Sequence, residues 1–296
     1  MTTHPPQTPA PVSSASAMPA LEALGHAYGR IALDERFLLN HGGRISEVQP
    51  THYSVRGLSG SARLGDMVSC KGKPGMGAGE IVRIMEDSVL VAPFDQGGKI
   101  GLGEAVFNRG PVSLAPGPQW RGRVVDALGR PADGKPAPMP GPLATTAPST
   151  TPPAMQRQRV SAPFMTGVRV IDIFTPLCHG QRLGVFAGSG VGKSTLLSML
   201  ANARAFDTVV IALVGERGRE VREFLEDTIG PEGMAKSVAV VATSDESAMM
   251  RRRAPDTAMR IAEYFRDRGD KVLLILDSIT RLAHALREVA IGAGEP

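Results

Sequence analysis

The sequence predicts an α/β protein whose mainly parallel sheet is preceded by a small N-terminal β-barrel. From about residue 168 onward, apolar strand-like runs alternate with helical runs, which indicates a parallel sheet with right-handed crossovers. Between residues 29 and 98, short apolar runs are instead separated by Gly, Pro, Asp and Asn, which is typical of a small barrel or sandwich.

The first part of the chain is not expected to pack. Residues 1–20 are rich in Pro, Ser, Thr and Ala, and they lack the charged start and apolar stretch of a signal peptide. We therefore predict a disordered tail and short helix at 1–28, the barrel at 29–98, and the α/β domain at 99–296. No run of eighteen apolar residues occurs, which predicts a soluble, cytoplasmic protein.

Residues 111–153 are rich in proline and glycine, which would suit a flexible linker. Within them, the segment 121–134 (RGRVVDALGRPADG) has the pattern of a strand and a turn. We therefore expect an ordered, irregular connection across the surface of the α/β domain.

The α/β domain is expected to contain four strand–helix units. The predicted strands are 181–187, 208–215, 237–243 and 271–277, and the predicted helices are 193–205, 218–230, 256–269 and 278–290. Gly230 suits a helix C-cap, and the nearly all-apolar run at 271–277 suits a strand covered on both sheet faces.

The strongest local signal is AGSGVGKST, which lies between a predicted strand and a predicted helix. Glycines in such a Walker A loop let backbone N–H groups curl around phosphate oxygens. We expect Lys193 to reach the β- and γ-phosphates of ATP and the Ser194 hydroxyl to ligate Mg²⁺. The predicted nucleotide-binding residues are Ala187, Gly188, Ser189, Gly190, Val191, Gly192, Lys193, Ser194 and Thr195. The one departure from the strict pattern is Ala187, which stands where the first glycine is usual.

Two acidic residues follow predicted strands. Asp277 ends the apolar run LILD, as a Walker B acid does, and there it can hold a Mg²⁺-bound water, although it could also serve only as a helix N-cap. Glu216, in GERGRE, can polarise a water for in-line attack on the γ-phosphorus, which makes it our candidate general base. Its alternative role is that of a surface acid in a charged turn.

Several arginines are candidate functional residues. The triplet at 251–253 is expected to lie in a solvated turn or a subunit interface, with a nucleic-acid contact as the third reading. Arg281 lies one helical turn after Asp277 and is expected to support the site. A net charge of only +4 and 4% aromatic residues argue against nucleic-acid binding.

Three longer runs carry a family resemblance. They are TGVRVIDIFTPLCHGQRLGVFAGSGVGKSTLL, VGERGREVREFLED, and the stretch from ATSDESAMMRRR to the final GEP. Together they resemble the rotary ATPase family, with the closest likeness to flagellar and type III export ATPases. The resemblance covers roughly residues 25–296 and is most specific from 166 onward.

The resemblance implies a RecA-like P-loop NTPase core with ATP and Mg²⁺ as cofactors. It implies catalytic roles for Lys193, Glu216, Arg217 and Asp277, metal ligation by Ser194 and Asp277, and phosphate placement by Arg217 and Arg281. Because the family continues well beyond GEP, with an adenine pocket, an arginine finger and a helical domain, we expect the chain to be incomplete at its C-terminus.

The resemblance also implies partners. Family members form homohexamers, and the segment at 1–28 lies where export ATPases bind a regulator related to the peripheral stalk. An export gate and chaperone–substrate complexes are further implied partners, with only peripheral membrane association at the cytoplasmic face of the inner membrane.

The function expected is therefore ATP hydrolysis that energises flagellar protein export. Virulence export through an injectisome is the alternative, because both branches share these motifs. Two other classes stay open: a non-catalytic nucleotide-binding ring subunit, which typically lacks the acid at Glu216, and a Rho-like RNA translocase.

Overall fold

The computed structural model describes residues 41–70, 77–95, 100–142, 144–145, 152–157, 159–160, 162–188 and 190–296. The predicted tail and helix at 1–28 lie outside the described residues, as does the predicted start of the barrel.

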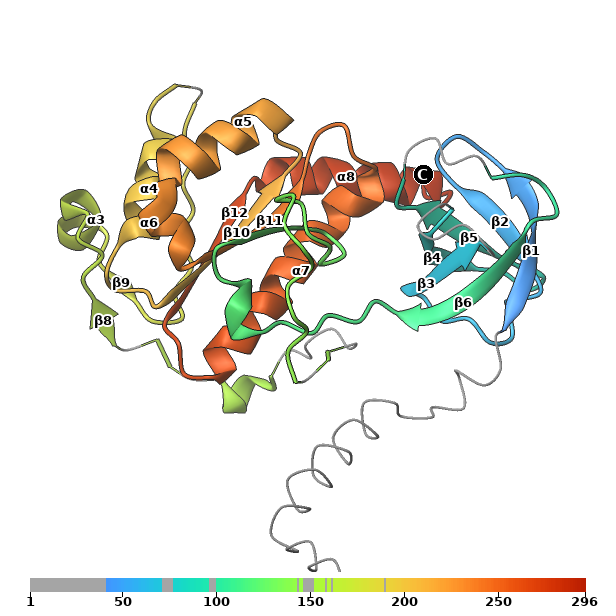
Figure 1. The fold of residues 1–296 in the computed structure, drawn as a ribbon, viewed down its shortest axis with the longest axis horizontal. Helices are drawn as coiled ribbons and strands as arrows, with labels where there is room; N and C mark the ends of the chain where they lie inside the picture. Colours follow the sequence, from blue (N-terminus) through green and yellow to red (C-terminus); the bar gives the residue numbers. More distant parts are fainter. Residues whose placement is uncertain are drawn as a thin grey trace, which may run out of the picture. The chain divides into compact units, whose positions relative to one another are not determined.

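The N-terminal module is a closed six-stranded barrel in the order β1-β2-β5-β4-β3-β6 (Figure 1). Its strands are β1 (Gly42–Val48), β2 (Tyr53–Arg56), β3 (Asp66–Cys70), β4 (Gly79–Ile84), β5 (Ser88–Pro93) and β6 (Ala105–Pro111). Tyr53, Val68 and Ile81 are among the apolar side chains that fill the interior. The barrel extends to Pro111 rather than ending at 98, because β6 pairs with both β1 and β3 and so closes it.

The α/β part is built on a parallel sheet in the order β12-β10-β11-β7. Its strands are β7 (Arg123–Asp126), β10 (Thr208–Val214), β11 (Ser237–Ala242) and β12 (Val272–Asp277). The strand predicted within 121–134 is thus an edge strand of this sheet, and the connection around it is ordered where the structure describes it.

Helices cover both faces of the sheet (Figure 1). They are α4 (Lys193–Asn202), α5 (Gly218–Glu223), α6 (Gly230–Ala235), α7 (Ala248–Asp267) and α8 (Ile279–Gly292). Alternate residues of β10 point to opposite faces: Val210 packs in one apolar cluster with α7, and Ile211 packs in another with the segment 218–235. This two-sided burial explains the continuous apolar runs in the strands.

Shorter elements complete the chain. They are the 3₁₀ turns η2 (Pro118–Trp120) and η3 (Ala154–Gln156), strands β8 (Pro163–Phe164) and β9 (Leu177–Cys178), helix α3 (Arg169–Phe174), and the π-helix η4 (Phe224–Ile229). The helix predicted at 218–230 is therefore α5 continued by η4. Gly230, with φ 72°, is the C-cap of η4 and also the first residue of α6.

The strand predicted at 181–187 is wrong. The segment forms no strand, and the Phe186 side chain is 97% exposed. Its apolar residues suggested burial, but a strand also needs a hydrogen-bonding partner. Among the described residues, β12 forms backbone hydrogen bonds with β10 only, so the segment 181–187 does not pair with its other edge. Most residues of β12 are accordingly only half-buried.

The helix predicted at 256–269 begins earlier, at Ala248. The Ser247 side chain caps it by accepting a hydrogen bond from the Met250 amide, and Pro255 lies within the helix. The arginine triplet at 251–253 is therefore helical, and its interpretation as a solvated turn is wrong: Arg253 pairs with Glu80 of the barrel, and its side chain is only 10% exposed.

None of the described helices combines the length and the apolar character needed to cross a membrane.

Candidate functional site

The glycine-rich loop leads directly into α4. Gly190 and Gly192 have φ of 76° and 95°, values that residues with a side chain rarely adopt, so the turn requires glycine at these positions. Gly192 is the N-cap of α4 and contributes no side chain. The first turn of a helix leaves N–H groups without intrahelical partners, and here they follow the loop directly.

The loop opens on a cavity of about 610 Å³. The segments that line it are the loop, the start of α4, the end of β10, the segment from α5 to η4, and both sides of the β12–α8 junction. The predicted site residues in its lining are Ala187, Gly188, Gly190, Gly192, Lys193, Ser194, Thr195, Glu216, Asp277 and Arg281.

Lys193 and Asp277 face each other within this cavity. The Lys193 Nζ lies 2.5 Å from Oδ1 of Asp277, whose side chain is 10% exposed. Asp277 is placed by the sheet register, because β10 and β12 run parallel and Leu213 pairs with Asp277. The carboxyl ends of the two strands thus bring Asp277 and Glu216 to the same edge of the sheet.

Glu216 is held from two directions. Its side chain, 15% exposed, forms an ion pair with Arg281 of α8. Its backbone oxygen accepts a hydrogen bond of 2.9 Å from the Ser244 amide. Gly215 allows the close approach of Arg281, since a Cβ at this position would lie 2.9 Å from Cδ of Arg281.

Comparisons with known proteins agree with this geometry. Residues 167–296 match the nucleotide-binding domain of the ATP synthase alpha/beta family. The chain is 57% identical over 260 residues to the flagellum-specific ATP synthase of Rhizobium meliloti (strain 1021), which covers 88% of this chain and 56% of the relative. Residues 167–296 are thus similar to that nucleotide-binding domain, and the chain is similar to flagellum-specific ATP synthases.

Other relatives and solved structures extend this similarity. The flagellum-specific ATP synthase of Agrobacterium fabrum is 55% identical over 94% of this chain and 58% of the relative. The type 3 secretion system ATPase of Xanthomonas euvesicatoria is 44% identical over 86% of this chain and 58% of the relative. The chain therefore spans less than two thirds of the length of these relatives.

A solved structure extends the likeness to three dimensions. The assembled ATPase EscN, in complex with its central stalk EscO from the enteropathogenic E. coli type III secretion system, superposes with a TM-score of 0.78 at 40% identity. The match covers 86% of this chain and 62% of that one. The predicted fold class, a RecA-like core preceded by a small barrel, is confirmed.

Three predicted site residues are not placed in the cavity. Ser189 lies outside the described residues. Val191 is 69% exposed and does not line the cavity. Arg217, with its side chain 67% exposed, is paired with Glu220 at 3.3 Å and also does not line it. A phosphate-placing role for Arg217 stays a prediction.

The cavity also contains residues that the sequence reasoning missed. Glu220, Glu223 and Phe224 line it from the segment after Glu216, as does Thr228. Their spacing of three and four residues is that of one helix face. A helix that directly follows a site residue turns one face toward the site, so this helical spacing could have predicted that these residues line the cavity.

The chemistry of the lining fits a magnesium nucleotide. The Ser194 hydroxyl and the Asp277 carboxylate are hard oxygen ligands, which Mg²⁺ prefers. Within the described part of the chain, no three or more His, Cys, Asp or Glu side chains gather as a metal cage. Mg²⁺ is usually bound through one or two protein groups together with substrate phosphates, and Ser194 and Asp277 offer two such groups.

The loop beside Glu216 contains a carboxyl with altered acidity. Burial raises the pKa of Glu246 above its usual value, although the Thr243 amide and hydroxyl donate to this carboxyl and favour its charged form. This contact folds the loop 243–247 onto itself, next to the Ser244 amide that holds Glu216.

Proposed function

We propose that this chain carries the ATP-hydrolysing site of a motor that energises protein export through the flagellar type III secretion apparatus. The observation that carries the proposal is the single cavity in which a glycine-rich loop, Lys193, Asp277 and Glu216 meet. A phosphate-binding loop alone would support only nucleotide binding, whereas a carboxylate in the same cavity adds a group that can activate water.

Each residue has a distinct task in the proposed reaction. The loop amides and Lys193 bind the triphosphate, and Lys193 exchanges its pairing with Asp277 for the phosphate oxygens. Glu216 accepts a proton from the attacking water, and Arg281 keeps the Glu216 side chain at the cavity wall until nucleotide enters. Ser194 and Asp277 would hold Mg²⁺, which supplies charge neutralisation at the phosphate oxygens.

Flagellar export is favoured over the alternatives by two lines of support. Two relatives at 57% and 55% identity carry flagellar names, while the type 3 secretion system ATPase of Xanthomonas euvesicatoria matches at 44%. The presence of Glu216 within the cavity counts against a non-catalytic ring subunit. The modest net charge and few aromatic residues count against an RNA translocase.

The proposed partners follow from the family. We propose that copies of this chain assemble in a ring with nucleotide between neighbours, by analogy with the assembled EscN and its stalk EscO. Residues 1–28 are proposed to contact a stalk-related regulator, and the ring to work with an export gate and chaperone–substrate complexes at the cytoplasmic face of the inner membrane.

The test is the ATP affinity and ATP turnover of the purified chain, alone and mixed with a full-length relative that supplies ring contacts. Lys193→Ala should lower ATP affinity about 10- to 100-fold, because a charged hydrogen-bonding partner of the phosphates is removed. Lys135→Ala, an exposed lysine remote from the cavity, is the matched control. Equal nucleotide affinity in the Lys193→Ala and parent proteins would refute the proposal.

A further inference from the structure

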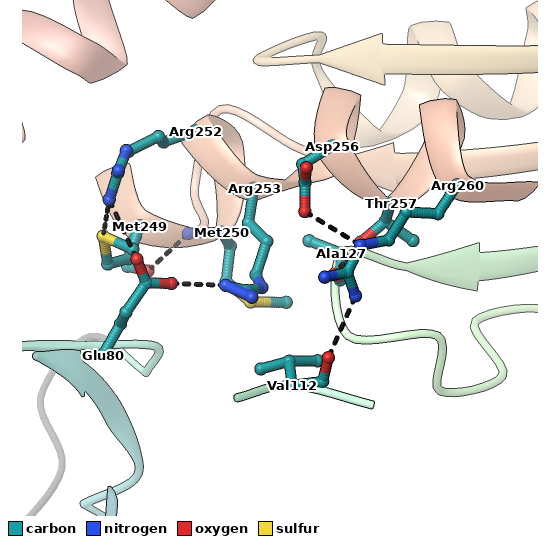
Figure 2. Close-up of polar contacts among 11 residues, drawn as sticks. Glu80, Val112, Ala127, Met249, Met250, Arg252, Arg253, Asp256, Thr257 and Arg260 are labelled. Atoms are coloured by element: carbon teal, nitrogen blue, oxygen red, sulfur yellow. Dashed lines mark hydrogen bonds and ion pairs between the residues drawn. The ribbon is translucent and has the colours of Figure 1, made fainter. Parts of the chain in front are cut away.

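Strand β4 of the barrel is joined to α7 by a buried carboxylate. Glu80 is 5% exposed, and its Oε1 accepts a hydrogen bond of 3.1 Å from Nη1 of Arg252 (Figure 2). Its Oε2 pairs with Arg253. A buried charge without a partner is costly, so this three-residue cluster fixes the first turns of α7 to the barrel.

The start of α7 is in turn connected to the cavity. The loop 243–247 leads from β11 into α7, and its Ser244 amide donates to the backbone oxygen of Glu216 at 2.9 Å. Ser247 caps the helix through the Met250 amide at 3.2 Å. Between Glu80 and Glu216, therefore, lie only the first turns of a helix and a short loop tied by hydrogen bonds.

A second connection runs through α8. Arg83, also on β4, donates from Nη1 to the backbone oxygen of Ala293 at 3.1 Å, where α8 ends. The opposite end of α8 carries Arg281, which pairs with Glu216. Arg251 of α7 and Glu288 of α8 are 2.9 Å apart, so the two helices are also tied to each other.

The contact between β4 and the helices is not continuous packing. A cavity of about 330 Å³ separates them, lined by Val82 of β4 together with Met249 of α7 and Val289 of α8. Val82 lies between Glu80 and Arg83 in sequence. Apolar contact is made beside the cavity by Ala92 and Phe94, which belong to the same core cluster as Met249, and Val82 packs against that cluster. Around the cavity, the polar contacts of Glu80 and Arg83 bridge β4 to the helices.

We propose that Glu80 and Arg83 are positioning residues for Glu216, acting through the barrel-facing ends of α7 and α8. Neither residue lines the nucleotide cavity, so neither is a catalytic residue. The inference rests on the proposed role of Glu216 in hydrolysis for its functional meaning. Its structural content, that the barrel holds Glu216 in place, can be measured without nucleotide.

The decisive measurement is hydrogen exchange of the Ser244 amide in the nucleotide-free chain. Glu80→Gln should speed this exchange about tenfold, because the start of α7 loses its attachment and opens locally more often. Asp66→Asn is the matched control: Asp66 is also a buried barrel carboxylate, but it is bonded to Arg63 and Asn108 within the barrel. Unchanged Ser244 exchange in a folded Glu80→Gln protein, or equal acceleration by Asp66→Asn, would overturn the inference.

Two milder variants cover the case in which Glu80→Gln does not fold. Arg252→Gln removes one of the two arginine partners of Glu80. The Arg252 side chain is 37% exposed, so this variant disturbs the fold less, and it should speed exchange of the Ser244 amide several-fold. Arg83→Gln should lower kcat about two- to fivefold with KM for ATP unchanged, as expected when a water-activating group is misplaced but binding is kept. Arg44→Gln is the control, because the one contact described for the Arg44 guanidinium is with the backbone oxygen of Gly103 in the barrel. It should change neither Ser244 exchange nor kcat.

The two proposals fail in different ways. If Lys193→Ala leaves nucleotide affinity intact, the proposed function fails while Ser244 exchange still reports on positioning. If Lys193→Ala abolishes binding but both Arg252→Gln and Arg83→Gln behave like the parent protein, only the positioning role is overturned.

Discussion

Lys193 Nζ and Asp277 Oδ1 are 2.5 Å apart, so the P-loop cation and the acid at the end of β12 neutralise each other in the free site. The pair keeps both groups at the cavity wall, with Asp277 nearly buried. In the proposed function, an entering triphosphate would offer Lys193 a new anionic partner and would release the Asp277 carboxylate for a cation.

Asp277→Asn should therefore weaken the binding of Mg²⁺-bound ATP more than the binding of ATP without Mg²⁺. The amide keeps the shape of the side chain but loses the negative charge that a hard cation requires. In the parent protein, ATP should bind more tightly in Mg²⁺ than in EDTA. We expect the ratio of these two affinities to be about tenfold smaller in Asp277→Asn. Titration with a fluorescent ATP analogue in both conditions measures it. Asp267→Asn, at an exposed position of α7, should behave like the parent protein.

Glu216→Gln should separate hydrolysis from binding. If Glu216 is the general base we propose, its loss should lower turnover about 10²- to 10⁴-fold, while the loop and Lys193, which we propose to bind the phosphates, are unchanged. Glu220→Gln is the matched control, because Glu220 lines the same cavity but pairs with Arg217. Equal losses of ATP affinity and turnover in Glu216→Gln would recast Glu216 as a binding or structural group.

The convergence of the site was predictable because it follows from strand order and local motifs. Lys193 follows a glycine loop that starts a helix, and Glu216 and Asp277 follow the carboxyl ends of two strands. Parallel strands place such ends at one edge of the sheet, so three distant motifs meet without any further information.

The errors arose where the outcome depends on distant partners. The apolar run at 181–187 indicated burial but could not show whether a strand would pair with it. The arginines at 252 and 253 read as a solvated turn, because their partner, Glu80, lies 172 and 173 positions away. No local pattern reports an ion pair of that separation. The closing of the barrel by β6 depends likewise on pairing with β1 and β3.

Gly215→Ala should disturb the site through Arg281. Gly215 has φ 70°, and an added Cβ would lie 2.9 Å from Cδ of Arg281, so the variant combines backbone strain with displacement of that side chain. We expect a loss of about 1–3 kcal/mol in unfolding free energy, measured by urea denaturation.

Gly218→Ala is the control for this substitution. Gly218 begins α5, and nothing lies within 4 Å of a Cβ built there. It should be neutral, or stabilising by up to about 1 kcal/mol, because alanine favours the helix. A Gly215→Ala protein as stable as Gly218→Ala would contradict the close approach of Arg281.

Asp133 gives the stability of the β7 edge a defined pH dependence. Arg123 donates to Asp133 from Nε at 2.6 Å and from Nη2 at 3.0 Å, and this lowers the Asp133 pKa from 3.8 to about 2. Because the folded-state pKa lies below the unfolded one, the stabilisation is complete above the unfolded value and disappears as the pH falls through the folded value. Asp133→Asn should thus cost about 1–2 kcal/mol at about pH 7 and much less at about pH 2. Urea unfolding of both proteins across this range measures the difference, and a gap that stays constant down to the lowest pH would show that the Asp133 charge is not what holds the turn.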